Sequence, residues 1–321
     1  MAQVLRQLPP VIDPAVVVGI ETGDDATVYR SPSGDLIVAT LDFFTPVVDD
    51  PYDFGRIAAA NSLSDVYAMG GRPIFALSIV AYPVKQGLAM LGRIMEGAAA
   101  VTTEAGIAIL GGHSIDDPVP KFGLVAIGIV KPEHLTANRG TLPGDRLYLT
   151  KPLGSGALAG ALKKGLLDEA AIRRVTEVMA TLNRKAAEAM NEALPRAATD
   201  VTGFGLLGHL HKLVAASGAE ARLRFGAIPF IEGASALYEA GAVPGGTKRN
   251  LEYYGCNAAF EGGPSWAPLA LADAQTSGGL LIAIAPERAP ILEAALRARG
   301  VPVHRIGEVV EGVAGRVTLR D

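Results

Sequence analysis

The chain has 321 residues, of which 49% are hydrophobic and 19% charged, so it can bury a sizeable core and is not expected to be disordered. Its 29 basic and 33 acidic side chains give a formal net charge of −4, which argues against a non-specific nucleic-acid binder. A single cysteine, Cys256, excludes an intrachain disulfide and a thiolate zinc site. No apolar run reaches the length of a membrane span, and the N-terminus lacks the pattern of a signal peptide. We therefore expect a cytoplasmic protein with no nucleic-acid or membrane partner.

The first half alternates short apolar runs with Ala-rich stretches. Three β-branched runs are predicted as buried strands, at 35–44 (DLIVATLDFF), 74–82 (IFALSIVAY) and 122–130 (FGLVAIGIV). Between them, residues 53–69 and 88–104 have helical spacing, and each run stops at a glycine, Gly70 and Gly106. This alternation predicts an α/β chain.

A Gly- and Pro-rich segment at 138–154 is typical of a domain boundary, and a new strand is expected from Asp145. We therefore predict two domains, residues 1–140 and 141–321. In the second domain the predicted helices are 168–193 and 204–216, and the predicted late strands are 279–285 and 301–310.

Several aspartates stand where a carboxylate needs a physical reason. Asp24 and Asp25 are adjacent, and Asp42 stands at the end of an apolar strand. Asp65 lies in a predicted helix among Ala, Leu, Val and Met, on a face that seldom carries an unpaired charge. Asp200 precedes a glycine-rich turn that opens a helix.

Taken singly, each of these aspartates has an ordinary alternative as a turn, cap or solvated strand-end residue. If they converge, they cannot all stay ionised without compensation. Mg²⁺ that bridges a polyphosphate supplies such compensation, because it prefers carboxylates, water and phosphate oxygens.

Three glycine segments are candidate anion sites. In LGGHSID (110–116) paired glycines allow close approach to a phosphate, although an ordinary turn between strands is as good a reading. GFGLLG (203–208) fits a dinucleotide fingerprint, which we discount because RAATDV before it is a poor buried strand. GGTKRN offers Lys248 and Arg249 beside a flexible turn, as an anion clamp or a solvated loop.

Other reactive side chains add little. His209 and His211 are two apart, so they lie on different sides of a helix and share no metal face. Cys256 is interpreted as a partly buried small residue and not as a nucleophile.

Several motifs together resemble selenophosphate synthetase, the selenide, water dikinase, within the aminoimidazole-ribonucleotide synthetase and thiamine-monophosphate kinase superfamily. These motifs run through nearly the whole chain in family order: ETGDDATVY, TLDFFTPVVDDPYDFGRIAAANSLSDVYAMGG, LGGHSID, LTKPLGSGAL, TDVTGFGLLGHL, AVPGGTKRN and DAQTSGGLL. The resemblance implies a two-domain α/β (α+β) fold whose N-terminal domains pair in a homodimer, with ATP in the cleft at their interface. It also implies the reaction ATP + selenide + water → selenophosphate + AMP + phosphate.

The resemblance also implies roles for particular residues. The expected magnesium ligands are Asp25, Asp65 and Asp200. The expected nucleotide contacts are Thr22, Gly23, Asp24, Asp42, Asp65, Gly112, His113 and Ser114. Selenide that arrives free and selenide passed on by a delivery protein are both compatible with the sequence.

The chain departs from the family upstream of Met1, where relatives carry a Cys or selenocysteine followed three residues later by Lys. Either this loop was removed before expression, or a UGA selenocysteine codon was read as a stop and the start was assigned to Met1. An in-frame UGA closely followed by a Lys codon in the upstream DNA would support the second explanation. We expect the printed chain to bind Mg–ATP and to turn over selenide poorly or not at all.

Two smaller departures are Gly23, where some relatives carry Arg, and Ala274, where Pro is usual. Two alternative functions stay open at this point. One is a thiamine-monophosphate kinase-like enzyme, which would make ADP instead of AMP. The other is a non-catalytic ATP-binding paralogue, for which four retained acidic positions would be hard to explain.

Overall fold

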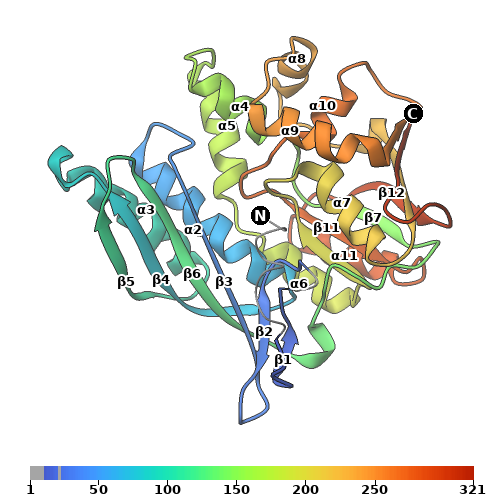
Figure 1. Ribbon diagram of the computed structural model, residues 1–321, viewed down its shortest axis with the longest axis horizontal. Helices are drawn as coiled ribbons and strands as arrows, with labels where there is room; N and C mark the ends of the chain where they lie inside the picture. The colour runs from blue at the N-terminus through green and yellow to red at the C-terminus, as the bar shows by residue number, and fades with distance from the viewer. Residues whose placement is uncertain (1–10, 21–22) are drawn as a thin grey trace.

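Two mixed β-sheets with their flanking helices make up the structure, a computed structural model that describes residues 11–20 and 23–321 (Figure 1). The first sheet has six strands in the order β1-β2-β3-β6-β4-β5. Their bounds are β1 Val16–Val18, β2 Thr27–Arg30, β3 Leu36–Phe44, β4 Arg72–Tyr82, β5 Ile109–Asp116 and β6 Lys121–Val130. Neighbouring strands are antiparallel, except that β5 runs parallel to β4 at one edge.

Two helices, α2 (Pro51–Ala68) and α3 (Ala89–Glu104), pack along one side of this sheet (Figure 1). Helix α2 begins as capping rules predict, because the Asp50 carboxylate accepts the backbone N–H of Asp53 at 2.9 Å. The two helices approach closely at glycines. A Cβ on Gly55 would lie 1.9 Å from the carbonyl oxygen of Ile94, and a Cβ on Gly97 would lie 1.9 Å from that of Tyr52.

The second sheet has seven strands in the order β10-β13-β9-β12-β7-β11-β8. Their bounds are β7 Arg146–Leu149, β8 Ala197–Asp200, β9 Glu220–Arg224, β10 Ala258–Phe260, β11 Leu280–Ile284, β12 His304–Val310 and β13 Val317–Arg320. The helices of this half are α4 Ser155–Leu162, α5 Glu169–Ala180, α6 Arg184–Ala193, α7 Gly205–Ala215, α8 Ala234–Glu239, α9 Gly245–Tyr254, α10 Ala267–Ala272 and α11 Ala289–Ala298.

The strands of the second sheet separate two apolar cores. Side chains alternate across a strand, so Leu147 and Leu149 of β7 join the core under α7 and α10. Tyr148 of β7 faces the other core, which continues through α6 and α11 to α2 of the first half. Helix α2 is therefore packed between the two halves of the molecule.

Most predicted elements are confirmed, and three expectations are wrong. The predicted helix 168–193 is two helices, because residues 181–183 leave the helical path and their polar groups bond elsewhere in the chain. The segment 110–116 is neither a loop nor a turn but strand β5 itself. The supposed flexible turn at 245–250 is the first part of α9.

The three predicted strands of the first sheet also differ in burial. Strand β6 is largely buried, whereas β3 is only partly so, with Leu41 and Phe43 exposed. Among the described residues, no helix combines the length and the apolar character needed to cross a membrane.

Candidate metal site

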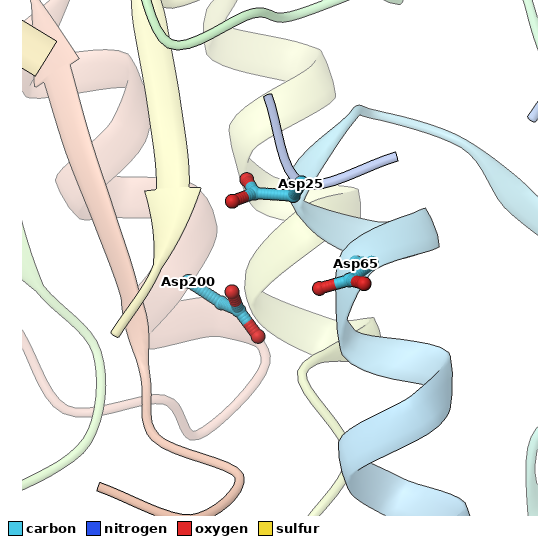
Figure 2. Close-up of side chains that lie close together, drawn as sticks. All are labelled: Asp25, Asp65 and Asp200. Atoms are coloured by element: carbon cyan, nitrogen blue, oxygen red, sulfur yellow. The ribbon is translucent and has the colours of Figure 1, made fainter. Parts of the chain in front are cut away.

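Three aspartates far apart in the sequence meet between the two sheets. Asp25 comes from the segment before β2, Asp65 from α2 and Asp200 from the end of β8. One carboxylate oxygen of each lies within 4.8 Å of the others, and the three side chains border a common space (Figure 2). In the part of the chain that the structure describes, this is the group of side chains with the spacing of metal ligands.

Hydrogen bonds orient two of these carboxylates and leave other oxygens free. The Thr40 hydroxyl donates to Asp65 Oδ2 at 2.6 Å, and the Thr199 hydroxyl donates to Asp25 Oδ1 at 2.8 Å. The Oδ2 atoms of Asp25 and Asp200 are buried and accept no hydrogen bond from any described residue. Buried unpaired carboxylate oxygens are costly, and a bound cation would satisfy both at once.

Burial raises the pKa of all three carboxyl groups, and the charges of neighbouring aspartates raise it further. For Asp65 burial is the largest cause, followed by the charges of Asp200 and Asp25. For Asp25 it is burial and then the charge of Asp200. Burial raises the pKa of Asp200 to about 6. Such a group favours a proton or a metal ion over three bare charges.

Asp42 lies beside this group and joins the two halves of the protein. Its Oδ2 accepts the side-chain N–H of Asn61 at 2.9 Å, and Asn61 Oδ1 accepts the backbone N–H of Ser277 at 2.8 Å. Burial raises the pKa of Asp42 to about 6. Asn61 and Asp65 lie four residues apart on α2, so one face of this helix carries both side chains toward the aspartate group.

The remaining predicted nucleotide contacts are spread more widely. Asp24 accepts the backbone N–H of Asn138 at 2.6 Å, and Gly23 is exposed. Thr22 lies outside the described residues. Gly112, His113 and Ser114 are exposed on β5 and do not belong to the aspartate group. A Cβ on Gly112 would lie 2.2 Å from the Ser78 carbonyl oxygen, so close strand packing already requires this glycine.

Sequence reasoning assigned no role to the strap 275–279 (QTSGG) or to the buried Lys151. Ser277 has a left-handed backbone (φ 48°), and its carbonyl accepts the Lys151 ammonium at 2.7 Å. Burial lowers the pKa of Lys151 to about 7. Gln275 Oε1 accepts the backbone N–H groups of Gly154 and Ser155. These N–H groups at the start of α4 are therefore already paired within the protein. The positive φ of Ser277 is visible only in the structure.

Two further expectations about this half are wrong. RAATDV does contain a buried strand, β8, because its small side chains are covered by the apolar cores on both faces of the sheet. Cys256 is exposed and not partly buried, because it lies in a short 3-10 turn after α9. The two histidines do lie on α7, where His209 is buried and neither belongs to the aspartate group.

Two family models, one for each half of the chain, match this protein. Residues 23–130 match the family model for AIR synthase related protein, N-terminal domain, and residues 143–320 match the model for the C-terminal domain. The fold and the site thus define an AIR synthase related protein. The chain is 48% identical over 322 residues to a selenide, water dikinase of Carboxydothermus hydrogenoformans, covering 100% of this chain and 93% of the relative. It is 49% identical over 318 residues to that of Myxococcus xanthus, covering 98% and 90%. The chain belongs to the selenide, water dikinase family.

Solved structures share the fold at lower identity. Thiamine-monophosphate kinase from Stenotrophomonas maltophilia has a TM-score of 0.71 at 21% identity, covering 96% of this chain and 92% of that one. The hydrogenase maturation protein HypE in complex with ATP has a TM-score of 0.70 at 20% identity, covering 88% and 81%. At these identities the likeness concerns the fold.

Proposed function

We propose that the chain synthesises selenophosphate from ATP, selenide and water, with release of AMP and phosphate. One observation carries this proposal: two buried aspartates and one partly buried aspartate converge, with two of their oxygens unpaired, in a chain 48–49% identical to selenide, water dikinases along nearly its full length. Thiamine-monophosphate kinases of the same fold are less similar, at 20–21% identity.

In this proposal Asp25, Asp65 and Asp200 hold magnesium. The two unpaired oxygens and the purely carboxylate donor set fit Mg²⁺, which prefers oxygen ligands. Bound there, the ion would neutralise the charge of the transferring and leaving phosphates. The chain's own residues keep the carboxylates in place through Thr40 and Thr199.

The nucleotide contacts also belong to the proposal, namely Thr22, Gly23, Asp24, Asp42, Asp65, Gly112, His113 and Ser114. We also propose that the two domains comprise residues 1–140 and 141–321. We place the reaction in the cytoplasm, and selenide handed over by a delivery protein remains an alternative to free selenide.

We further propose a homodimer formed through the first sheet. Large apolar side chains are exposed on it, with Leu41 and Phe43 on β3 and Leu110 and Ile115 on β5 each at least 47% exposed. Helices α2 and α3 pack on one side, so a second copy could cover the other (Figure 1). Such a pairing would also bring the exposed β5 contacts next to a partner subunit.

The test is phosphorus NMR of the protein with ATP, magnesium and selenide without oxygen, on the printed chain and on a chain extended by a Cys-x-x-Lys loop. We expect AMP and a selenophosphate resonance from the extended chain, both dependent on selenide and both absent when that chain carries Asp65→Asn. Without the loop we expect little or no turnover. ADP formed without selenide would overturn the proposal and favour a kinase of the same fold. ATP left unchanged by both chains would favour a non-catalytic ATP-binding protein.

A further inference from the structure

The buried side chain of His209 lies on α7, close to the aspartate group but outside it. It is 6% exposed, and its ring packs against Phe204 with the ring centroids 5.5 Å apart. The backbone N–H of Thr202 points at His209 Nε2 from 3.1 Å. A backbone amide can only donate, so Nε2 accepts and carries no proton.

The other ring nitrogen must then carry the proton. Burial, and after it the charge of Lys212, lowers the pKa of His209 to about 3, so the ring is neutral. A neutral imidazole with a bare Nε2 is protonated at Nδ1. His209 Nδ1 lies 3.4 Å from the Thr199 hydroxyl oxygen, a long hydrogen bond in which the ring donates.

The Thr199 hydroxyl accepts from His209 and in turn donates to Asp25. Because its oxygen accepts from the ring, its own proton is left to donate. Asp25 Oδ1 lies 2.8 Å away, and the main-chain oxygen of Asp200 lies 3.1 Å away. The shorter bond goes to the carboxylate, as charge-assisted bonds do. With Oδ1 engaged, the buried Oδ2 of Asp25 accepts nothing from the described residues.

We propose that His209 is a positioning residue for metal binding, acting through Thr199 to orient the Asp25 carboxylate toward Asp65 and Asp200. The inference rests on the proposed magnesium site and deepens it. His209 and Thr199 belong to the second half of the protein and Asp25 to the first, so these hydrogen bonds also hold a ligand in place across the two halves. Outer partners of this kind set the orientation of metal ligands.

The alternative is a purely structural role, in which His209 only fills the core and accepts the Thr202 amide. Two near-isosteric substitutions distinguish this structural role from the positioning role. In His209→Asn the amide nitrogen can occupy the place of Nδ1 and donate to Thr199. In His209→Gln the amide oxygen can occupy the place of Nε2 and accept from Thr202, but no donor remains for Thr199. Thr199→Val and Thr199→Ser give the same contrast one step nearer to Asp25.

The experiment measures Mn²⁺ binding to the nucleotide-free protein by electron paramagnetic resonance, with Mn²⁺ as a carboxylate-binding probe. We expect His209→Gln and Thr199→Val to bind Mn²⁺ about 10-fold more weakly or worse. His209→Asn and Thr199→Ser should bind as wild type does. The double variant His209→Gln/Thr199→Val should be no weaker than either single variant, because both break the same chain.

Several results would overturn the positioning role. They are wild-type affinity in His209→Gln, equal weakening in His209→Asn, and additive losses in the double variant. Urea unfolding of each variant shows whether it is folded, and the Thr199 pair carries the test if the histidine variants are not. If Mn²⁺ affinity falls in these variants as expected but the protein makes no selenophosphate, only the proposed function is rejected. If the protein makes selenophosphate but Thr199→Val binds Mn²⁺ as tightly as wild type, only the positioning role is rejected.

Discussion

At the scale of single residues, the aspartates that are proposed to bind a metal ion destabilise the folded protein when no ion is bound. Asp65 is only 9% exposed, and Asp25 and Asp200 repel its charge. Without a cation, this repulsion raises the free energy of the folded state relative to the unfolded chain, where the same charges are apart and hydrated. Functional sites often carry such a cost.

We expect Asp65→Asn to stabilise the protein in the absence of divalent cations by about 1–2 kcal/mol. The asparagine oxygen can still accept from Thr40, and its N–H groups can donate to the neighbouring carboxylates. In the presence of Mg²⁺ the variant should be less stable than wild type, because it loses the stabilisation that metal binding provides. Thermal melting in EDTA and in Mg²⁺ measures both, with the exposed Asp49→Asn as control; a variant less stable than wild type in EDTA contradicts the argument.

His209 predicts a pH dependence of stability. Its pKa is about 3 in the folded protein against 6.5 for the free side chain. Below pH 6.5 the unfolded chain takes up a proton that the folded protein refuses, so stability is present above 6.5 and is lost progressively down to about pH 3. At pH 5 the loss is about 2 kcal/mol.

The measurement is the difference in free energy of unfolding between wild type and His209→Gln. This difference should change by about 2 kcal/mol between pH 7.5 and pH 5, with wild type losing more than the variant. Parallel curves for the two proteins would show that the buried ring takes up its proton in the folded state as readily as in the unfolded one.

At the scale of elements, helix α2 decides where the site lies. It presents Asn61, Ser64 and Asp65 toward the second half of the chain, and these polar side chains are buried on a helix whose buried residues are mostly apolar. Its position depends on the crossing with α3, where Gly55 and Gly97 bring the two backbones together. No larger residue fits at that crossing without moving the helix.

We expect Gly97→Ala to destabilise the protein by about 2 kcal/mol or more, because the added methyl group overlaps the Tyr52 carbonyl. The matched control is Gly92→Ala on the same helix, where a Cβ would meet nothing within 4 Å. That substitution should stabilise the helix by up to about 1 kcal/mol. Urea unfolding of both proteins gives the comparison, and similar values for the two would show that the crossing relaxes freely.

At the scale of the whole molecule, buried hydrogen bonds link the two halves beside the site. Asn183 donates to the Ser64 hydroxyl and to the Gly278 carbonyl, both at 2.8 Å, and is 2% exposed. Nearer the surface, Arg56 pairs with Glu177 through two bonds of 2.9 and 3.0 Å. The Glu177 side chain is 64% exposed, so solvent screens this pair.

Asn183→Ala should therefore cost about 2–3 kcal/mol, since it leaves buried partners unpaired. Glu177→Gln should cost no more than about 1 kcal/mol, despite the better geometry of its ion pair. Denaturant unfolding ranks the two variants. Equal costs would mean that the surface pair joins the halves as strongly as the buried amide does.

The sequence by itself determined most element types and the candidate ligands. Apolar β-branched runs placed β3 and β4 within a few residues, and helical spacing that stops at a glycine placed α2. An unpaired Asp65 on an apolar helix face already indicated a buried site. These properties are local, because propensity, capping and burial pattern act within one element. The sequence could not show that Asp25 and Asp200 meet Asp65, since no local rule relates residues 175 positions apart.

Only the tertiary structure decided what each polar group faces. It made a strand of LGGHSID, a helix of GGTKRN and a buried strand of AATD, because neighbouring strands and cores outweigh weak local preferences. It also aligned His209, Thr199 and Asp25 across the two halves of the molecule. The direction of a hydrogen bond depends on which donor lies opposite, and packing sets that partner after the elements have formed.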